Sequence, residues 1–192
     1  MQLPERVFFT GVPGSRWSSI SQKLSELDGM NNSDWSKERE YAHGKFSGHK
    51  GAYFGKKMEY EDHLYPGYID SAWKEPGGCK IVKSHDWALK LDNVKKEFPD
   101  DWIMLVYRPD VSSYAWWFEA GGFSIEYPNY SAYNDHIGMQ HAIAEQNNCI
   151  LKFAHKHNLT WNYFNSSWIE HNFNQTLSVE KSWPDILVTI LK

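Results

Sequence analysis

The sequence is poor in the features that mark several common protein classes. Only two of its 192 residues are cysteines, Cys79 and Cys149, and no C-x-x-C motif occurs. A disulfide-rich framework is therefore excluded, and nothing signals a zinc ribbon or a thioredoxin-like site. No apolar run approaches the roughly 20 residues of a membrane span, and no signal-peptide core opens the chain. These absences predict a cytoplasmic protein without a membrane span. A lumenal domain of a longer chain stays open as an alternative because N-x-S/T sequons occur at Asn31, Asn158, Asn165 and Asn174.

Positive charge is not in excess either. The chain has 20 Lys and Arg residues against 24 Asp and Glu residues, for a formal net charge of -4. General nucleic-acid binding is disfavoured because it requires a dominant basic face. Hydrophobic residues make up 41% and charged residues 23%, which is typical of a globular protein. A chain of this length can bury a sizeable core, so we expect one domain over residues 1–192.

Short apolar runs alternate with segments of helical spacing along the chain. The apolar runs predict strands at 6–10, 79–83, 102–107 and 159–164. Helical periodicity and stop signals predict helices at 17–27, 66–73, 87–98, 110–119 and 134–157. Loops are predicted at 28–65, with short elements, and at 121–133, and the tail holds one or two short helices before 186–191. The alternation predicts an α/β fold in which a parallel β-sheet of about four to five strands is flanked by helices.

A glycine- and serine-bearing loop lies between the first predicted strand and the helix that follows it. The loop and the first helical turn contribute backbone N–H groups, one fixed positive charge and three hydroxyls, from Gly11, Gly14, Ser15, Arg16, Ser18 and Ser19. Backbone amides at a helix N-terminus are suited to bind an anion. The loop is not a Walker A motif, which would place Gly and Lys where Arg16 and Trp17 stand. An ordinary turn before a serine-capped helix is the alternative interpretation.

Two further strand ends carry side chains that could act in catalysis or bind an anion. Lys83 and His85 close the second predicted strand, and alternation along an extended segment would aim both side chains to one side. A histidine can accept a hydroxyl proton, and a lysine can neutralise a phosphate or sulfate oxygen. Arg108 ends the next strand and can bind a phosphate in bidentate fashion, with Ser112 and Ser113 at the following helix start. In open α/β sheets, ligands bind at the carboxyl ends of the strands, where these residues lie. The alternative is that His85 is a loop histidine without a catalytic role.

These residues resemble the motifs of sulfotransferases that use 3′-phosphoadenosine 5′-phosphosulfate (PAPS). In that family a first loop of the type P-K-S-G-T-T-W is followed by a strand ending K-T-H, and then by a strand ending in Arg before a Ser-bearing helix. The corresponding segments here are PGSRWSS at 13–19, KIVKSH at 80–85, and WIMLVYR with DVSS within 102–113. The resemblance covers roughly residues 6–120.

The resemblance implies a P-loop-NTPase-like sulfotransferase architecture. It also implies transfer of a sulfuryl group from PAPS to a hydroxyl or amine acceptor, with 3′-phosphoadenosine 5′-phosphate (PAP) as product and no metal required. His85 would be the general base, while Lys83 and Arg16 would contact the transferring group. Arg108 with Ser112 or Ser113 would hold the 3′-phosphate. The loop that would hold the 5′-phosphosulfate comprises Pro13, Gly14, Ser15, Arg16, Trp17, Ser18 and Ser19.

This chain departs from the family pattern at three places. The first-loop Lys of the family falls on Gly14, so Arg16 would have to substitute for it. The interval from Arg108 to Ser113 is shorter than in the commonest members, and the late R-K-G segment is absent. Two alternatives therefore stay open, a small nucleotide-dependent kinase-like transferase and a non-catalytic PAP-binding module of the same fold.

The acceptor site is indicated only by residue type. We expect a small-molecule or carbohydrate acceptor, because aromatic faces suit aromatic or sugar-like groups. The candidate aromatic residues are Tyr127, Tyr130 and Tyr133 on a predicted loop. Three further histidines lack metal-ligand spacing and are expected to be solvated loop residues. They are His43, His49 and His63.

Overall fold

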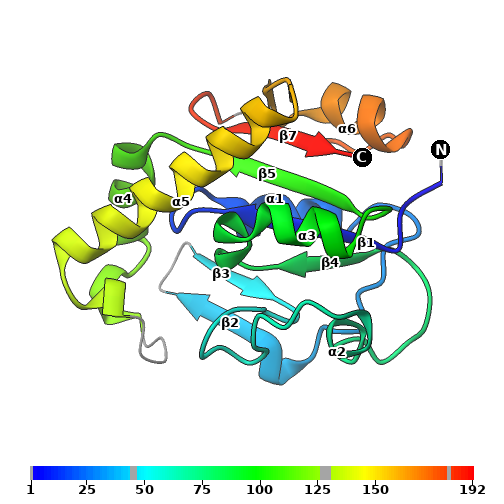
Figure 1. Ribbon diagram of the computed structural model, residues 1–192, viewed down its shortest axis with the longest axis horizontal. Coiled ribbons are helices and arrows are strands. Elements are labelled where there is room, and N and C mark those ends of the chain that lie inside the picture. Colours follow the sequence, from blue (N-terminus) through cyan, green and yellow to red (C-terminus); the bar gives the residue numbers. More distant parts are fainter. Residues whose placement is uncertain (1, 44–46, 126–130, 181–182) are drawn as a thin grey trace.

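A mixed five-stranded sheet forms the centre of the molecule (Figure 1). The computed structural model describes residues 2–43, 47–125, 131–180 and 183–192. The strand order is β4-β1-β5-β7-β6. The strands are β1 (Arg6–Gly11), β4 (Lys80–Lys83), β5 (Trp102–Tyr107), β6 (Asn162–Tyr163) and β7 (Leu187–Leu191). The predicted α/β class with a helix-flanked sheet of this size is confirmed.

The sheet is parallel only in its core. β1 pairs in parallel with β4 and with β5, whereas β7 runs antiparallel to β5, and β6 antiparallel to β7. The prediction of a fully parallel sheet is therefore wrong at one edge. The strand predicted at 159–164 is reduced to the two exposed residues of β6, which pair only with β7 at the edge of the sheet.

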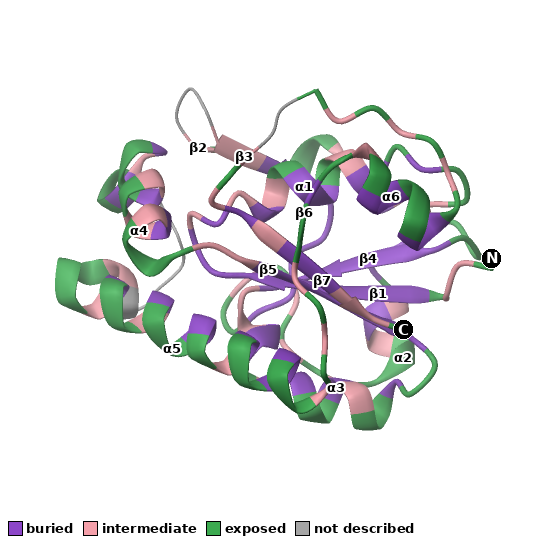
Figure 2. Cartoon of the chain, turned by 90° about the horizontal axis from the view of Figure 1, so that it is seen from above, coloured by how far each residue is buried: buried purple, intermediate pink, exposed green. Residues whose placement is uncertain are grey.

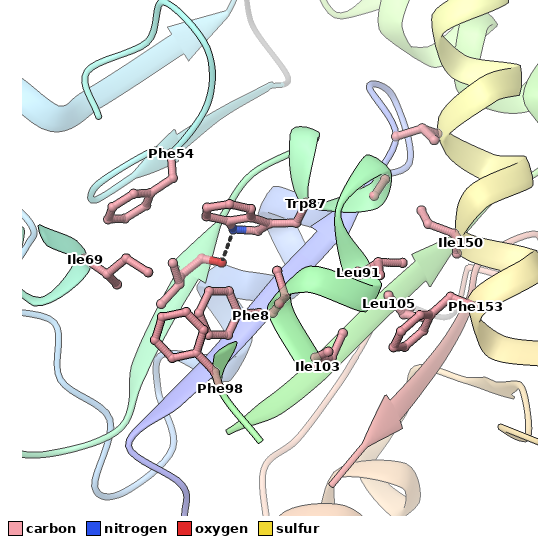
Figure 3. Packing of buried hydrophobic residues seen from close by; sticks show 14 of the residues in the cluster. Phe8, Phe54, Ile69, Trp87, Leu91, Phe98, Ile103, Leu105, Ile150 and Phe153 are labelled. Atoms are coloured by element: carbon pink, nitrogen blue, oxygen red, sulfur yellow. Dashed lines mark hydrogen bonds between the residues drawn. The ribbon is translucent and has the colours of Figure 1, made fainter. Parts of the chain in front are cut away.

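Alternation along β1 divides the core into two layers. Phe8 faces a cluster that includes η2 (Asp86–Leu89), α3 (Leu91–Glu97) and α5 (His136–Lys156), as Figure 3 shows. Val7 and Phe9 face the opposite cluster, which includes α1 and α6. The helices of this second layer are α1 (Trp17–Leu24) and α6 (Ser166–Phe173). Figure 2 shows the two helical layers on either side of the buried strands.

Side-chain caps explain where α5 and α6 begin. The Asp135 side chain accepts a hydrogen bond of 2.7 Å from the Gly138 N–H and begins α5. Asn165 caps α6 in the same way. The predicted helix at 87–98 is split at Lys90 into η2 and α3. The two remaining α-helices are α2 (Pro66–Asp70) and α4 (Asp110–Glu119). No helix in the described part of the chain is both long and apolar enough to cross a bilayer.

A β-hairpin lies in the segment that the sequence predicts as loop with short elements. After η1 (Lys37–Arg39), β2 (Glu40–His43) pairs antiparallel with β3 (Ser47–Lys50). The following residues attach to the free edge of β4, since the Phe54 N–H donates to the Lys83 carbonyl at 2.9 Å. The hairpin therefore stands beside the sheet edge that carries Lys83, as Figure 1 shows. Two short turns of helix, η3 (Gly122–Ser124) and η4 (Ser131–Asn134), complete the structure.

A buried ion network closes the amino end of the parallel strands. Arg6 donates to Asp101 at 3.0 Å and to Asp70 at 2.5 Å, and Lys80 reaches Asp70 at 3.0 Å and Glu5 at 3.2 Å. Burial by itself would lower the pKa of Arg6, but its hydrogen bonds and ion pairs with the two aspartates outweigh burial and raise it. This end of the sheet is electrostatically satisfied.

Candidate active site at the carboxyl edge of the sheet

Three strand ends meet at the opposite edge because β4, β1 and β5 run in parallel. The His85 ring donates from Nδ1 to the Gly11 carbonyl, and the Thr10 hydroxyl donates to the His85 carbonyl at 3.3 Å. Arg108 donates from Nη1 to the Gly14 carbonyl at 2.9 Å. Direct hydrogen bonds thus tie the first loop to His85 on one side and to Arg108 on the other.

The first loop is a tight turn packed against α4. The Ser15 N–H donates to the Val12 carbonyl at 3.0 Å, and Gly14 has φ +78°. A Cβ atom on Gly14 would lie 1.9 Å from the Ser113 carbonyl oxygen. A lysine at this position, as in the sulfotransferase pattern, does not fit this loop conformation. The sequence difference at Gly14 therefore has a structural cause.

Arg16 places a positive charge at the start of α1. Its guanidinium carbon lies 3.4 Å from the centre of the Trp116 ring, and its Nε is buried without a hydrogen-bond partner. Burial lowers the pKa of Arg16, and the neighbouring Arg108 charge lowers it further. A buried unpaired donor costs about 1–3 kcal/mol. The first turn of α1 has no acidic residue and the helix has no side-chain cap, so a bound anion would relieve both deficits.

His85 is held in the tautomer that a general base requires. A carbonyl oxygen can only accept, so the contact with Gly11 places the proton on Nδ1 and leaves Nε2 as the proton-accepting nitrogen. The ring packs edge-on against Trp17, with 4.7 Å between ring centres. Burial lowers the pKa of His85 to about 4, so the imidazole is neutral at pH 7.

Lys83 lies in a different cavity from His85. Its ammonium donates to the Lys50 carbonyl, in a small cavity also lined by Asp34. Extended alternation ends with β4 at Lys83, and His85 adopts helical angles of φ -68° and ψ -32°, so the two side chains diverge. Burial lowers the pKa of Lys83 to about 8, whereas the nearby carboxylates of Asp34 and Glu59 act to raise it. Lys83 thus anchors the end of β3 beside the site.

Arg108 and Ser113 are hydrogen-bonded to neighbours within the chain. Arg108 Nε donates to Asp185 at 2.7 Å, and Asn147 donates to the Arg108 carbonyl at 2.8 Å. Ser113 is fully buried and its hydroxyl donates to the same carbonyl at 3.2 Å. Ser112 is half-buried in the first turn of α4. The Arg108 guanidinium is therefore fixed in orientation beside the first loop.

His49 belongs to the site, although the sequence analysis expects a solvated ring. It lies on β3, is only 7% exposed, and stacks on Tyr41 with 4.4 Å between ring centres. Its Nε2 is buried without a hydrogen-bond partner. Burial lowers the pKa of His49 to about 2, helped by the nearby Lys83 charge. The expectation holds for the exposed His63 and is wrong for His49.

Two adjacent pockets open between the first loop and the hairpin. The inner one has a volume of about 50 Å³, and its lining includes Gly14, Trp17, Tyr53 and His85. The outer one has a volume of about 400 Å³ and lies between α1 and the β2–β3 hairpin. The residues that line both are Arg16, Ser18, Ser47, His49 and Trp116. The two pockets are therefore parts of one cleft.

Of the three predicted loop tyrosines, Tyr133 is not among the residues that line this cleft. Tyr127 and Tyr130 lie outside the described residues. Tyr133 packs against Trp117 with 5.8 Å between ring centres. Within the described ranges, no group of three or more His, Cys, Asp or Glu residues is arranged to hold a metal ion.

A scan against protein-family models finds no match to this chain, and comparisons with curated proteins and with solved structures find none either.

Proposed function

We propose that the chain is a sulfotransferase that moves a sulfuryl group from PAPS to a hydroxyl or amine acceptor. The observation that carries the proposal is the half-buried Arg16 side chain, whose buried Nε lacks a hydrogen-bond partner beside Arg108 at the uncapped start of α1. An anionic donor group at this point would satisfy the Nε, screen the two guanidinium charges from each other and meet the N-terminal end of the helix.

PAPS would supply the activated sulfur, whose bond to the 5′-phosphate oxygen breaks as the acceptor oxygen or nitrogen bonds to it. His85 Nε2 takes the proton that the acceptor loses, and PAP leaves. Arg16 and the amides of the first loop stabilise the negative charge that grows on the leaving phosphate. Negative charge bound near His85 raises its pKa from about 4 and so makes the ring a better base. Positioning and charge stabilisation account for the chemistry, as in phosphoryl transfer.

Lys83 acts indirectly in this proposal. Its ammonium is turned away from the inner pocket and holds the Lys50 carbonyl, so it fixes β3 and with it His49. Arg108 with Ser112 or Ser113 remains the candidate for the 3′-phosphate. Of these two serines, Ser112 is the more exposed.

A non-catalytic PAP-binding module is the second candidate. Gly14 supports it, because the first loop lacks a lysine and has no room for one. Both candidates bind PAP, and only the first transfers sulfate. A kinase-like transferase would instead require binding of a nucleoside triphosphate with Mg²⁺.

Transfer of ³⁵S-labelled sulfate from PAPS to a panel of hydroxyl and amine acceptors separates these functions. We expect turnover by the wild-type protein, and we expect His85→Ala to lower the rate by roughly 10²–10⁴-fold, the usual contribution of a general base. His63→Ala is the matched control, because that histidine is exposed and packs against Tyr65 and Tyr68 away from the cleft.

PAP affinity, measured by titration calorimetry, should be similar in all three proteins. PAP binding without turnover on any acceptor would favour the non-catalytic module. Absence of PAP binding, together with Mg²⁺-dependent ATP binding, would overturn the sulfotransferase proposal.

A further inference from the structure

The outer pocket of the cleft has the size of a ligand site and a lining unlike that of the inner pocket. Its volume of about 400 Å³ lies within the roughly 300–1,000 Å³ range of small-molecule sites. One wall is the first turns of α1, and the other is the β2–β3 hairpin. The Arg16 guanidinium on the Trp116 ring borders both pockets.

Neutral hydrogen-bonding groups line much of the outer pocket, and the Arg16 charge lies where it borders the inner pocket. Three hydroxyls and one amide come from Ser18, Ser19, Ser47 and Gln22. Glu40 and Lys50 face each other across the hairpin at 3.4 Å, so their charges are paired with one another. Aromatic surface is supplied by Tyr41 and Trp116, both half-buried.

A buried polar atom points to a ligand. His49 borders the outer and the inner pocket, is only 7% exposed, and has an Nε2 without a hydrogen-bond partner. Buried polar groups normally have partners, and a ligand hydroxyl would supply one here. The same hydroxyl would lie in the part of the cleft that His85 also borders.

We propose that the outer pocket binds an uncharged sugar, a monosaccharide or disaccharide. One hydroxyl of this sugar would point toward His49 and His85. Several hydroxyls on one rigid ring match the serine and glutamine groups, and the apolar face of a sugar ring packs on aromatic side chains. A phenol would offer one hydroxyl and leave most of the polar lining unpaired. The role of the sugar as sulfate acceptor rests on the proposed function, whereas its binding does not.

Titration calorimetry with defined saccharides tests this site in the full chain. The probes are methyl β-D-glucopyranoside, methyl β-D-galactopyranoside, methyl α-D-mannopyranoside and cellobiose, each with and without PAP, with 4-nitrophenol as the aromatic comparison. Gln22→Trp fills the pocket from an exposed position on α1, and Gln140→Trp makes the same change at an exposed position on α5.

We expect at least one saccharide to bind, Gln22→Trp to weaken that binding by roughly tenfold or more, about 1.4 kcal/mol, and Gln140→Trp to leave it unchanged. PAP affinity should be the same in all three proteins. The inference is overturned if no saccharide binds in the presence or absence of PAP, if both variants lose binding equally, or if only 4-nitrophenol binds. Saccharide binding without PAP binding would support the sugar site and count against the sulfotransferase proposal. PAP binding without saccharide binding would support the sulfotransferase proposal and overturn the sugar site.

Discussion

The two ends of β1 place an arginine in opposite electrostatic situations. At the amino end, Arg6 is buried among carboxylates and donates to Asp70, Asp101 and Glu5, so its pKa is raised. Just beyond the carboxyl end, Arg16 has a buried Nε without a partner, and its pKa is lowered by burial and by Arg108. Arg6 therefore has its ion-pair partners within the fold, whereas the Nε of Arg16 has no hydrogen-bond partner in the protein.

This difference predicts which edge of the sheet contributes to the free energy of unfolding and which is available to bind a ligand. A charge that is paired inside the protein is costly to break, because its partners are left buried and uncompensated. The Arg16 guanidinium interacts with Asp185 and Glu119 only electrostatically, and its Nε has no hydrogen-bond partner, so we propose that it is available to a ligand. The amino edge should therefore respond to mutation in stability, and the carboxyl edge in binding.

The largest stability effect is expected at the amino edge. Arg6→Met leaves the carboxylate of Asp101 buried at 7% side-chain exposure without its ion pair, so the free energy of unfolding should fall by about 3–5 kcal/mol. Arg16→Met should change it by about 1 kcal/mol or less, because the side chain loses cation–π contacts and electrostatic attraction to half-exposed or exposed carboxylates but no buried ion pair. Urea denaturation measures both. Equal losses in the two variants would contradict the comparison.

The packing of the first loop predicts a smaller stability effect at the carboxyl edge. Gly14→Ala forces a Cβ toward the Ser113 carbonyl in a left-handed backbone conformation, so we expect a loss of about 1–3 kcal/mol. Gly67→Ala is the control, since nothing lies within 4 Å of a Cβ added there and the residue is within α2. If Gly14→Ala melts at the same temperature as the wild type, the loop does not pack tightly against the Ser113 carbonyl, and the prediction is wrong.

Stability should also depend on pH through the half-buried His85 and the buried His49. Their pKa values fall from 6.5 to about 4 for His85 and about 2 for His49 because of burial, so only the unfolded chain binds these protons between pH 6.5 and 4. Stability is then complete above pH 6.5 and falls as the pH drops toward 4. His49→Phe should flatten this slope by up to about 1.4 kcal/mol per pH unit.

Urea denaturation at pH 7, 6 and 5 checks this slope. His63→Phe, at an exposed position, serves as the control and should keep the wild-type slope. Equal slopes for wild type and His49→Phe would mean that His49 is not buried as a neutral ring.

Much of the sheet could be predicted from local pattern, because β1, β4 and β5 each contain consecutive apolar residues and are buried over nearly their whole length. The antiparallel direction of β7 could not, since pairing direction depends on how the chain returns to the sheet and not on its residues. The hairpin was missed because each strand has four residues and β2 has no buried one. Period-two alternation of Tyr41 with His43, and of Ser47 with His49, was the available signal.

The candidate site was predictable in its outline and not in its detail. The rule that parallel strands end at one edge is enough to bring the first loop, His85 and Arg108 together. The direction of Lys83 depends on where β4 ends and on the helical angles of His85, which residue type does not reveal. His49 enters the site through contacts between segments far apart in sequence, with Trp17 and Tyr53.

Titration calorimetry of PAP with the wild-type protein and Arg16→Gln tests the central claim most directly, with Lys96→Gln as a control at a side chain that is 80% exposed. We expect PAP to bind the wild type and the control equally. Arg16→Gln should bind roughly 10- to 100-fold more weakly, in line with the loss of charge-assisted hydrogen bonds. An unchanged dissociation constant in Arg16→Gln, or no PAP binding by the wild type, would contradict the assignment of the carboxyl edge as the anion site.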